Sequence, residues 1–337
     1  MQEKRMLAPA ALTLLLGLGV FAQGGLATLR KLKQYDLPGP PGKRFDYLTI
    51  DTDGGYLISA HLAANQTYVI DLHTDRVLAT VADTPGVEGV EYVPEFKKVY
   101  TSNAGDNTIG VVDIKQMKVI RKLKTESKPD GSAYATPFHK LYVSDERAKA
   151  EAIVDVTKDE IIKTLHFDCE TGMPQYDPIA RKVYVNLQDI NIFAVIDPNT
   201  DEVIGRYPVG RCKGNHGMTI DPEHHRAFLS CEENNLMTVF DLDKHQPIAY
   251  FPMADGADVI KFDSGLQRIY AACYSGAISV FHQDDPQHYR KLEDLKVQHA
   301  VHSLAVNQET HRVYTPEQEE HGKPVARMVV YEAVTGN

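Results

Sequence analysis

The tetrapeptide Val69-Ile70-Asp71-Leu72 returns along the chain at a fixed spacing. Its aspartate recurs every 42 residues, within Val111-Val112-Asp113-Ile114, Ile153-Val154-Asp155-Val156 and Val195-Ile196-Asp197-Pro198. The pattern continues after 44 residues as Val239-Phe240-Asp241 and degrades to Val280-Phe281-His282 and Val329-Val330-Tyr331, which makes seven copies. A period of about 40 residues, built from short apolar runs separated by turn residues, is typical of propeller blades with four strands each.

An aromatic residue provides a second landmark, 13 positions before the aspartate. It is Tyr100, Tyr142, Tyr184 and Phe228 in successive copies, it returns as Tyr270 and Tyr314, and Ile58 replaces it in the first copy. Within one unit, alternation of apolar and polar residues predicts strands over residues 131–135, 140–144, 152–156 and 161–165. The sequence therefore predicts an all-β fold, a seven-bladed β-propeller of four-stranded blades.

The two ends of the chain predict how the ring closes. The last copy supplies strands near residues 302–306, 312–315 and 327–332, and the few residues after them are too short for a fourth strand. Residues 29–33 (Leu-Arg-Lys-Leu-Lys) match 120–124 (Ile-Arg-Lys-Leu-Lys), the expected outer strand of the second blade. We expect the N-terminal strand to complete the last blade, because this removes an open sheet edge.

The repeat resembles the YVTN-type repeat of YncE-like propellers, which are secreted or periplasmic. The motifs that carry the resemblance are Lys-Pro-Asp-Gly-Ser-Ala (128–133), Lys-Leu-Tyr-Val-Ser (140–144) and Ile-Ile-Lys-Thr-Leu (161–165). The resemblance covers residues 29–332 and implies a propeller fold. It selects no chemistry, since related seven-bladed folds include lactonases, amine dehydrogenase subunits and binding modules without catalytic activity.

The N-terminus predicts export. Residues 1–22 carry Lys4 and Arg5, then a short apolar stretch that ends in small residues at Val20 and Ala22, as signal peptides do. We expect cleavage after Ala22, which leaves residues 23–337 as one propeller domain in the periplasm or outside the cell, without stable membrane insertion. An uncleaved anchor is the alternative. Cleavage changes the formal charge from −10 to about −11, which disfavours nucleic acid as a partner.

The four cysteines, Cys169, Cys212, Cys231 and Cys273, form no Cys-x-x-Cys pair, so a structural zinc site has little support. In the blade register, Cys212 and Cys231 lie on the same face. An oxidising compartment permits a disulfide between them. Buried free thiols are the alternative.

One position per blade is expected at the entrance of the central channel. Alignment of the seven inner strands places there Asp46, Glu88, Asp130, Gly172, His216, Asp258 and His302. Carboxylates that crowd together repel one another unless a cation or proton intervenes, and imidazoles add nitrogen ligands. The sequence thus predicts a divalent metal site formed by Asp46, Glu88, Asp258, His216 and His302. Asp130 belongs to a Pro-Asp-Gly turn, and turn roles for Asp46, Glu88 and Asp258 remain open.

Further candidates for binding a small polar ligand lie in or next to the same entrance. His216 follows Asn215 and precedes a glycine, which lets the backbone bring the imidazole close to a ligand. Loops between second and third strands add His61, Asp145 and Glu232. The predicted ligand-binding set is therefore His216, His302, His61, Asn215, Asp145 and Glu232.

Motifs for catalysis are missing from the sequence. It contains no Gly-x-Ser-x-Gly elbow, P-loop, His-Glu-x-x-His or Rossmann glycine motif, so no nucleotide cofactor is indicated and no catalytic residue is assigned. We expect a monomeric binding module for a metal ion or small polar ligand at the channel mouth. The alternatives are a metal-dependent hydrolase of lactones or esters in the same cleft and a scaffold for a protein partner.

Overall fold

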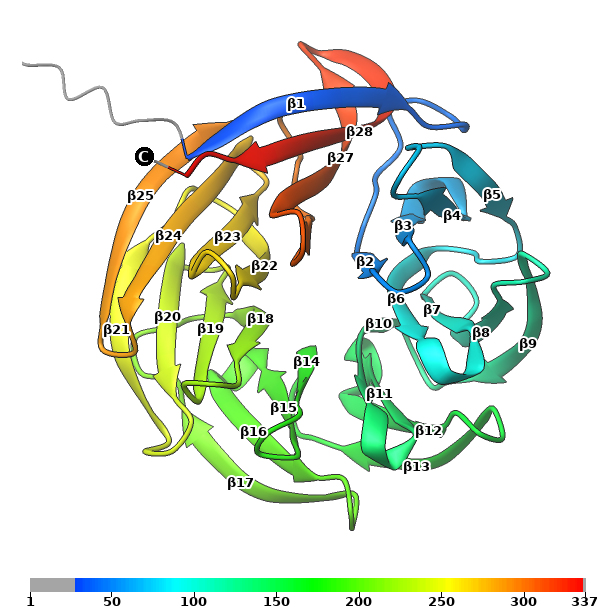
Figure 1. Cartoon of the computed structure of the whole chain (residues 1–337). Coiled ribbons are helices and arrows are strands. Elements are labelled where there is room, and N and C mark those ends of the chain that lie inside the picture. The colour runs from blue at the N-terminus through cyan, green and yellow to red at the C-terminus, as the bar shows by residue number, and fades with distance from the viewer. Residues whose placement is uncertain (1–27, 336–337) are drawn as a thin grey trace, which may run out of the picture.

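The computed structural model describes residues 28–335, which form seven four-stranded antiparallel sheets arranged as blades around a central channel (Figure 1). The fold predicted from the repeat is confirmed. The predicted signal peptide, residues 1–22, lies outside the described residues. No helix within residues 28–335 is long and apolar enough to cross a membrane.

The strands of each blade follow one another from the channel outward. Blade one contains β2 (Leu48–Asp51), β3 (Tyr56–His61), β4 (Gln66–Asp71) and β5 (Val77–Val81). Blade two contains β6 (Val87–Val93), β7 (Lys98–Asn103), β8 (Thr108–Asp113) and β9 (Lys118–Lys124). Blade three contains β10 (Pro129–Ala135), β11 (Lys140–Asp145), β12 (Ala150–Asp155) and β13 (Glu160–His166). Blade four contains β14 (Thr171–Asp177), β15 (Lys182–Leu187), β16 (Ile192–Asp197) and β17 (Glu202–Pro208).

The remaining blades follow the same plan. Blade five contains β18 (Asn215–Asp221), β19 (Arg226–Cys231), β20 (Leu236–Asp241) and β21 (Gln246–Pro252). Blade six contains β22 (Ala257–Asp263), β23 (Arg268–Cys273), β24 (Ala277–Asp285) and β25 (His288–Lys296). Blade seven combines β26 (Ala305–Asn307), β27 (Arg312–Glu320) and β28 (Lys323–Ala333) with β1 (Leu29–Asp36). Short 3-10 turns occupy Leu62–Ala64, Pro94–Phe96, Thr136–Phe138, Glu146–Ala148 and Gln188–Ile190.

Blade seven is closed by the N-terminal strand, as predicted. β1 pairs antiparallel with β28, with Leu29 opposite Ala333 and Asp36 opposite Arg327, and Figure 1 shows the two strands side by side. Leu29 is 2% exposed. The first and last described strands therefore pair with each other, and β1 covers the outer edge of β28.

The two repeated residues of the sequence have structural roles. Asp71 Oδ1 accepts hydrogen bonds from the backbone N–H groups of His73 and Thr74, and Asp113 accepts the equivalent pair, so the aspartate organises the turn before the outer strand in blades one and two. The aromatic landmark joins neighbouring blades, because the hydroxyl of buried Tyr142 donates to Asp201 Oδ1 (2.6 Å) of blade four.

The cysteines divide into two groups. Cys212 and Cys231 form a disulfide between the segment that enters blade five and the end of β19. Cys169 and Cys273 are free and buried. The pairing inferred from the blade register is therefore present, and the other two thiols fill apolar space.

Candidate functional site

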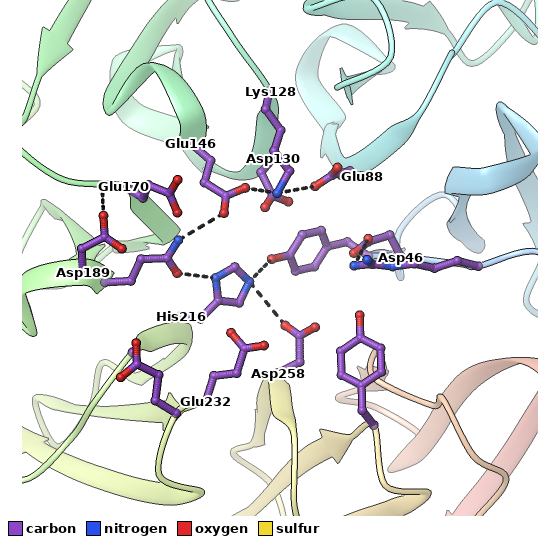
Figure 2. Close-up of a pocket in the computed structure, with 16 residues that line it drawn as sticks. Asp46, Glu88, Lys128, Asp130, Glu146, Glu170, Asp189, His216, Glu232 and Asp258 are labelled. Carbon is purple, nitrogen blue, oxygen red and sulfur yellow. Dashed lines mark hydrogen bonds and ion pairs between the residues drawn. The ribbon is translucent and has the colours of Figure 1, made fainter.

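A polar cavity of about 330 Å³ opens at the channel mouth, where the inner strands begin and several loops converge (Figure 2). Nine carboxylates line it, together with Arg44, Lys128 and His216 as the basic groups. The carboxylates are Asp46, Glu88, Asp130, Glu146, Glu170, Asp189, Glu232, Glu233 and Asp258. The mouth is therefore strongly acidic and favours ligands with positive charge.

A β-bulge at the start of the inner strands brings side chains to the mouth. In blade two, Val87 pairs with Asn103 and Val90 with Thr101, so that Glu88 and Gly89 together face one residue of β7. The same shift occurs in β10, β14, β18 and β22. A bulge of this kind turns the first of its two residues away from the regular pleat.

Glycine at the second bulge position lets neighbouring blades approach. A Cβ at Gly89 would lie 2.1 Å from the backbone oxygen of Asp130, and a Cβ at Gly217 would lie 2.1 Å from that of Asp258. Such contacts are too short for any side chain. The sequence pairs Glu88-Gly89, Asp130-Gly131 and His216-Gly217 thus bring their polar residues close together around the mouth.

Three carboxylates form a cluster on one side of the mouth, which we call the carboxylate triad: Glu88, Asp130 and Glu146. One oxygen from each lies within 4.8 Å of the others, close enough to share a metal ion. The ammonium of Lys128 bonds Glu146 and lies 3.7 Å from Glu88 Oε2 (Figure 2). Oδ1 of Asp130, a residue 5% exposed, has no hydrogen-bond partner among the described residues.

The crowding changes the pKa values of the triad. Burial, followed by the charges of Asp130 and Asp46, raises the pKa of Glu88 to about 10. Burial and the charge of Asp46 raise the pKa of Asp130 to about 7. In the absence of a ligand, protons therefore compensate part of the repulsion near neutral pH. A bound cation would compensate the repulsion between the carboxylates instead, and the protons would be released.

His216 is held in one orientation at the centre of the mouth. Gln188 donates its amide N–H to Glu146 Oε1 (3.2 Å), so its Oε1 is left to accept from Nδ1–H of His216 (2.9 Å). Nε2 of His216 then faces the Tyr47 hydroxyl (3.1 Å) and Asp258 Oδ1 (3.4 Å), as Figure 2 shows for Asp258. The network fixes which ring nitrogen points toward the acidic groups.

The charge of His216 follows from its neighbours. Burial lowers its pKa, but the carboxylates of Asp258, Asp130 and Glu232 outweigh burial and raise it above its ordinary value. The pKa of Asp258 is raised by burial despite the nearby imidazoles. His216, which lies against the cavity, therefore holds its proton to higher pH than an ordinary imidazole.

The structure brings five of the predicted site residues together at the cavity wall: Asp46, Glu88, His216, Glu232 and Asp258. His302 lies close by but outside the lining, because the ring of Tyr274 stacks on it with centroids 4.3 Å apart. Its Nε2 is 4.0 Å from Asp46 Oδ2. Burial opposes ionisation of Asp46, but His302 and Arg44 hold its pKa below its ordinary value.

Three other predicted residues have structural partners and lie away from the cavity lining. His61 is fully buried, stacks on Phe45 and bonds the hydroxyl of Tyr68. Asn215 donates to Asn186 Oδ1 and to the backbone oxygen of Ile192. Asp145 accepts the backbone N–H groups of residues 126 and 127.

Sequence reasoning missed several residues of the lining: Arg44, Tyr47, Lys128, Glu146, Glu170, Gln188, Asp189, Glu233 and Tyr274. Most of them follow a second strand or precede an inner strand. A signal was present in the loops, because Glu146 and Gln188 each begin a 3-10 turn directly after the second strand of their blade. Asp145, which ends the second strand of blade three, was predicted as a ligand-binding residue instead of its neighbour Glu146.

No family model and no curated protein matches the chain. Solved structures do. Hydrazine synthase from Kuenenia stuttgartiensis superposes with a TM-score of 0.75 at 15% identity, over 93% of this chain and 99% of that chain. A chain of a mitotic checkpoint complex superposes with a TM-score of 0.75 at 11% identity, over 99% of both chains. At these identities the likeness establishes the seven-bladed propeller fold alone.

Proposed function

We propose that the protein binds a small cationic ligand, a metal ion or a polar organic cation, at the channel mouth. The observation that carries the proposal is the charge of the cavity: nine carboxylates face two permanent cations and His216. The buried, unpartnered Oδ1 of Asp130 adds an acceptor that a cation would satisfy. Membership of the YncE-like family remains part of this proposal and rests on the repeat motifs alone.

A metal ion would bind at the carboxylate triad. Three carboxylates are hard oxygen ligands, which favour Ca²⁺, Mg²⁺ or Mn²⁺ over softer metals. Lys128 occupies the same place with its ammonium and competes with an incoming ion. Removal of that ammonium is therefore expected to strengthen the binding of a metal ion.

Titration calorimetry with Ca²⁺, Mg²⁺ and Mn²⁺ tests the proposal. We expect Lys128→Met to bind at least about tenfold more tightly than the parent, because a like charge about 4 Å away is removed. Lys158→Met, which removes an ammonium that is 64% exposed and pairs with Asp155, is the control and leaves affinity unchanged. Binding by the parent also releases protons from Glu88 and Asp130, which buffers of different ionisation enthalpy reveal. If neither protein binds these ions or an organic diamine, the proposal fails.

A metal-dependent hydrolase in the same cavity is the second candidate. His216 favours it, because its imidazole is fixed by Gln188, lines the cavity and can move a proton to or from a bound ester. A panel of lactones and esters, assayed with the metal that binds, separates this candidate from simple binding.

The proposal includes export to an oxidising compartment. The disulfide between Cys212 and Cys231 supports it, since such bonds persist outside the reducing cytosol. Mass spectrometry of the mature protein from its native compartment tests both the disulfide and cleavage after Ala22.

A further inference from the structure

A second cavity of about 230 Å³ lies further along the central channel, and Tyr47 lines both cavities. We call it the inner chamber. Its wall is formed by the inner strands themselves, with Thr49 of β2, Ser132 of β10 and Gln175 of β14 as polar groups. The inner chamber is separate from the carboxylate triad, and none of the mouth's nine carboxylates lines it.

The inner chamber contains one carboxylate and one ammonium. Glu91 belongs to β6 of blade two and Lys261 to β22 of blade six. Blades seven and one separate these two blades around the ring, and Figure 1 shows β6 and β22 on opposite sides of the channel. Charge on this wall is thus balanced, in contrast to the acidic mouth.

Neither charged group has a partner. Within residues 28–335, Glu91 and Lys261 take part in no hydrogen bond or ion pair, although both are half-buried. Other half-buried lysines of this propeller are paired: Lys98 lies 2.7 Å from Asp159, and Lys140 lies 2.6 Å from Asp201. A partly buried charge without a partner destabilises the folded protein. A ligand that pairs with Glu91 and Lys261 would remove this cost.

The titration of the two groups agrees with this geometry. Burial raises the pKa of Glu91 to about 7, against the opposing charge of Lys261. Burial likewise lowers the pKa of Lys261, against the charge of Glu91. Each group is the other's opposing charge, but no hydrogen bond or ion pair joins the two. A ligand that contacts both would restore the ordinary charge of each.

We propose that the inner chamber binds a small zwitterion, whose ammonium contacts Glu91 and whose carboxylate contacts Lys261. The volume supports a ligand of amino-acid size, because cavities for drug-sized ligands occupy roughly 300–1,000 Å³. This site is independent of cation binding at the mouth.

Calorimetry with glycine, β-alanine, γ-aminobutyrate and L-serine tests the proposal on the parent protein. We expect at least one of them to bind, and acetate and methylamine, which carry one charge each, to bind at least about tenfold more weakly. Ionisation of Glu91 on binding releases protons near neutral pH, because burial raises its pKa in the free protein. Comparison of phosphate and Tris buffers detects the change in bound protons without any variant.

Two variants locate the site. Lys261→Met and Glu91→Gln each remove one charge with little change in size, and each is expected to weaken zwitterion binding at least about tenfold. Lys115→Met, on an exposed turn of blade two, is the matched control and leaves binding unchanged. The proposal is overturned if no zwitterion binds, if acetate or methylamine binds equally well, or if both variants bind like the parent. Cation titrations of the same variants report separately on the mouth.

Discussion

Replacement of Glu151 by methionine is predicted to stabilise the propeller, by an amount that grows with pH. Glu151 lies on β12 with no exposed surface, and both of its carboxyl oxygens lack a partner among the described residues. It faces Ser144 across the ladder. The equivalent positions of blades two, four and five hold Ile109, Phe193 and Met237, all fully buried. A carboxyl group therefore occupies a position that the fold uses for apolar packing.

The magnitude has two parts. Burial, reinforced by the charge of Asp145, raises the pKa of Glu151 well above its ordinary value. A buried neutral carboxyl without partners costs roughly 1–3 kcal/mol, which Glu151→Met recovers at low pH. Above the ordinary pKa of 4.5, the unfolded chain loses its proton while the folded chain keeps it. The parent then loses about a factor of ten in its folding equilibrium constant for each pH unit, until the folded-state pKa is reached.

Urea unfolding of parent and variant at pH 5, 6, 7 and 8 measures the effect. The difference between the two proteins is the relevant quantity, because the raised pKa values of Glu88 and Asp130 affect both equally. Glu151→Gln removes the pH dependence and keeps an unpartnered polar group. Glu160→Met, exposed on β13, is the control and changes neither stability nor its pH dependence. A difference between parent and Glu151→Met that stays constant from pH 5 to 8 would refute the assignment of a protonated Glu151.

Three further predictions concern closure, the disulfide and the mouth. Deletion of residues 29–36 is expected to cost at least about 3 kcal/mol, from loss of a buried leucine and of the pairing with β28, and a truncated monomer with the parental melting temperature would contradict ring closure. Replacement of Cys212 and Cys231 by serine opens a loop with a sequence separation of 19 and is expected to cost about 3 kcal/mol in denaturant unfolding, whereas unchanged stability would contradict a structural disulfide. His216→Ala is expected to weaken ligand or metal binding with little loss of stability, while His73→Ala, whose side chain is 81% exposed in an outer turn, alters neither.

Much of the fold was predictable because the copies of the repeat form similar strands and turns from similar local sequence. Asp71 and its equivalents were recognised from spacing alone, and the structure shows that Asp71 and Asp113 accept the same pair of backbone N–H groups in their turns. The match between residues 29–33 and 120–124 identified the closing strand, and both segments do belong to outer strands. Their burial differs, since Leu29 and Leu123 are buried whereas Leu32 and Ile120 are exposed. The same register placed Cys212 and Cys231 on one face, and the structure decides between the two alternatives in favour of the disulfide.

The channel mouth was predictable only in part. The equivalent bulge residues Glu88, His216 and Asp258 were placed at the cavity by alignment of the repeats, because each blade presents that position in the same way. His302 has an equivalent place in the alignment, yet the ring of Tyr274 covers it. The period of the repeat does not show which side chain of one blade covers a side chain of the next blade, as Tyr274 covers His302.

The sequence by itself determined the number of blades, their strands and the closure of the ring, since these depend on local alternation and turn residues that recur with the period. Only the tertiary structure decided that Lys128 enters the carboxylate triad, that Glu146 faces the cavity and Asp145 turns away, and that Glu91 and Lys261 stand unpaired across the channel. The physical reason is that these charges interact through space between blades, and that Glu146 lies in a 3-10 turn, where the alternation of the strand ending at Asp145 no longer applies. Neither fact is encoded in the spacing along the chain.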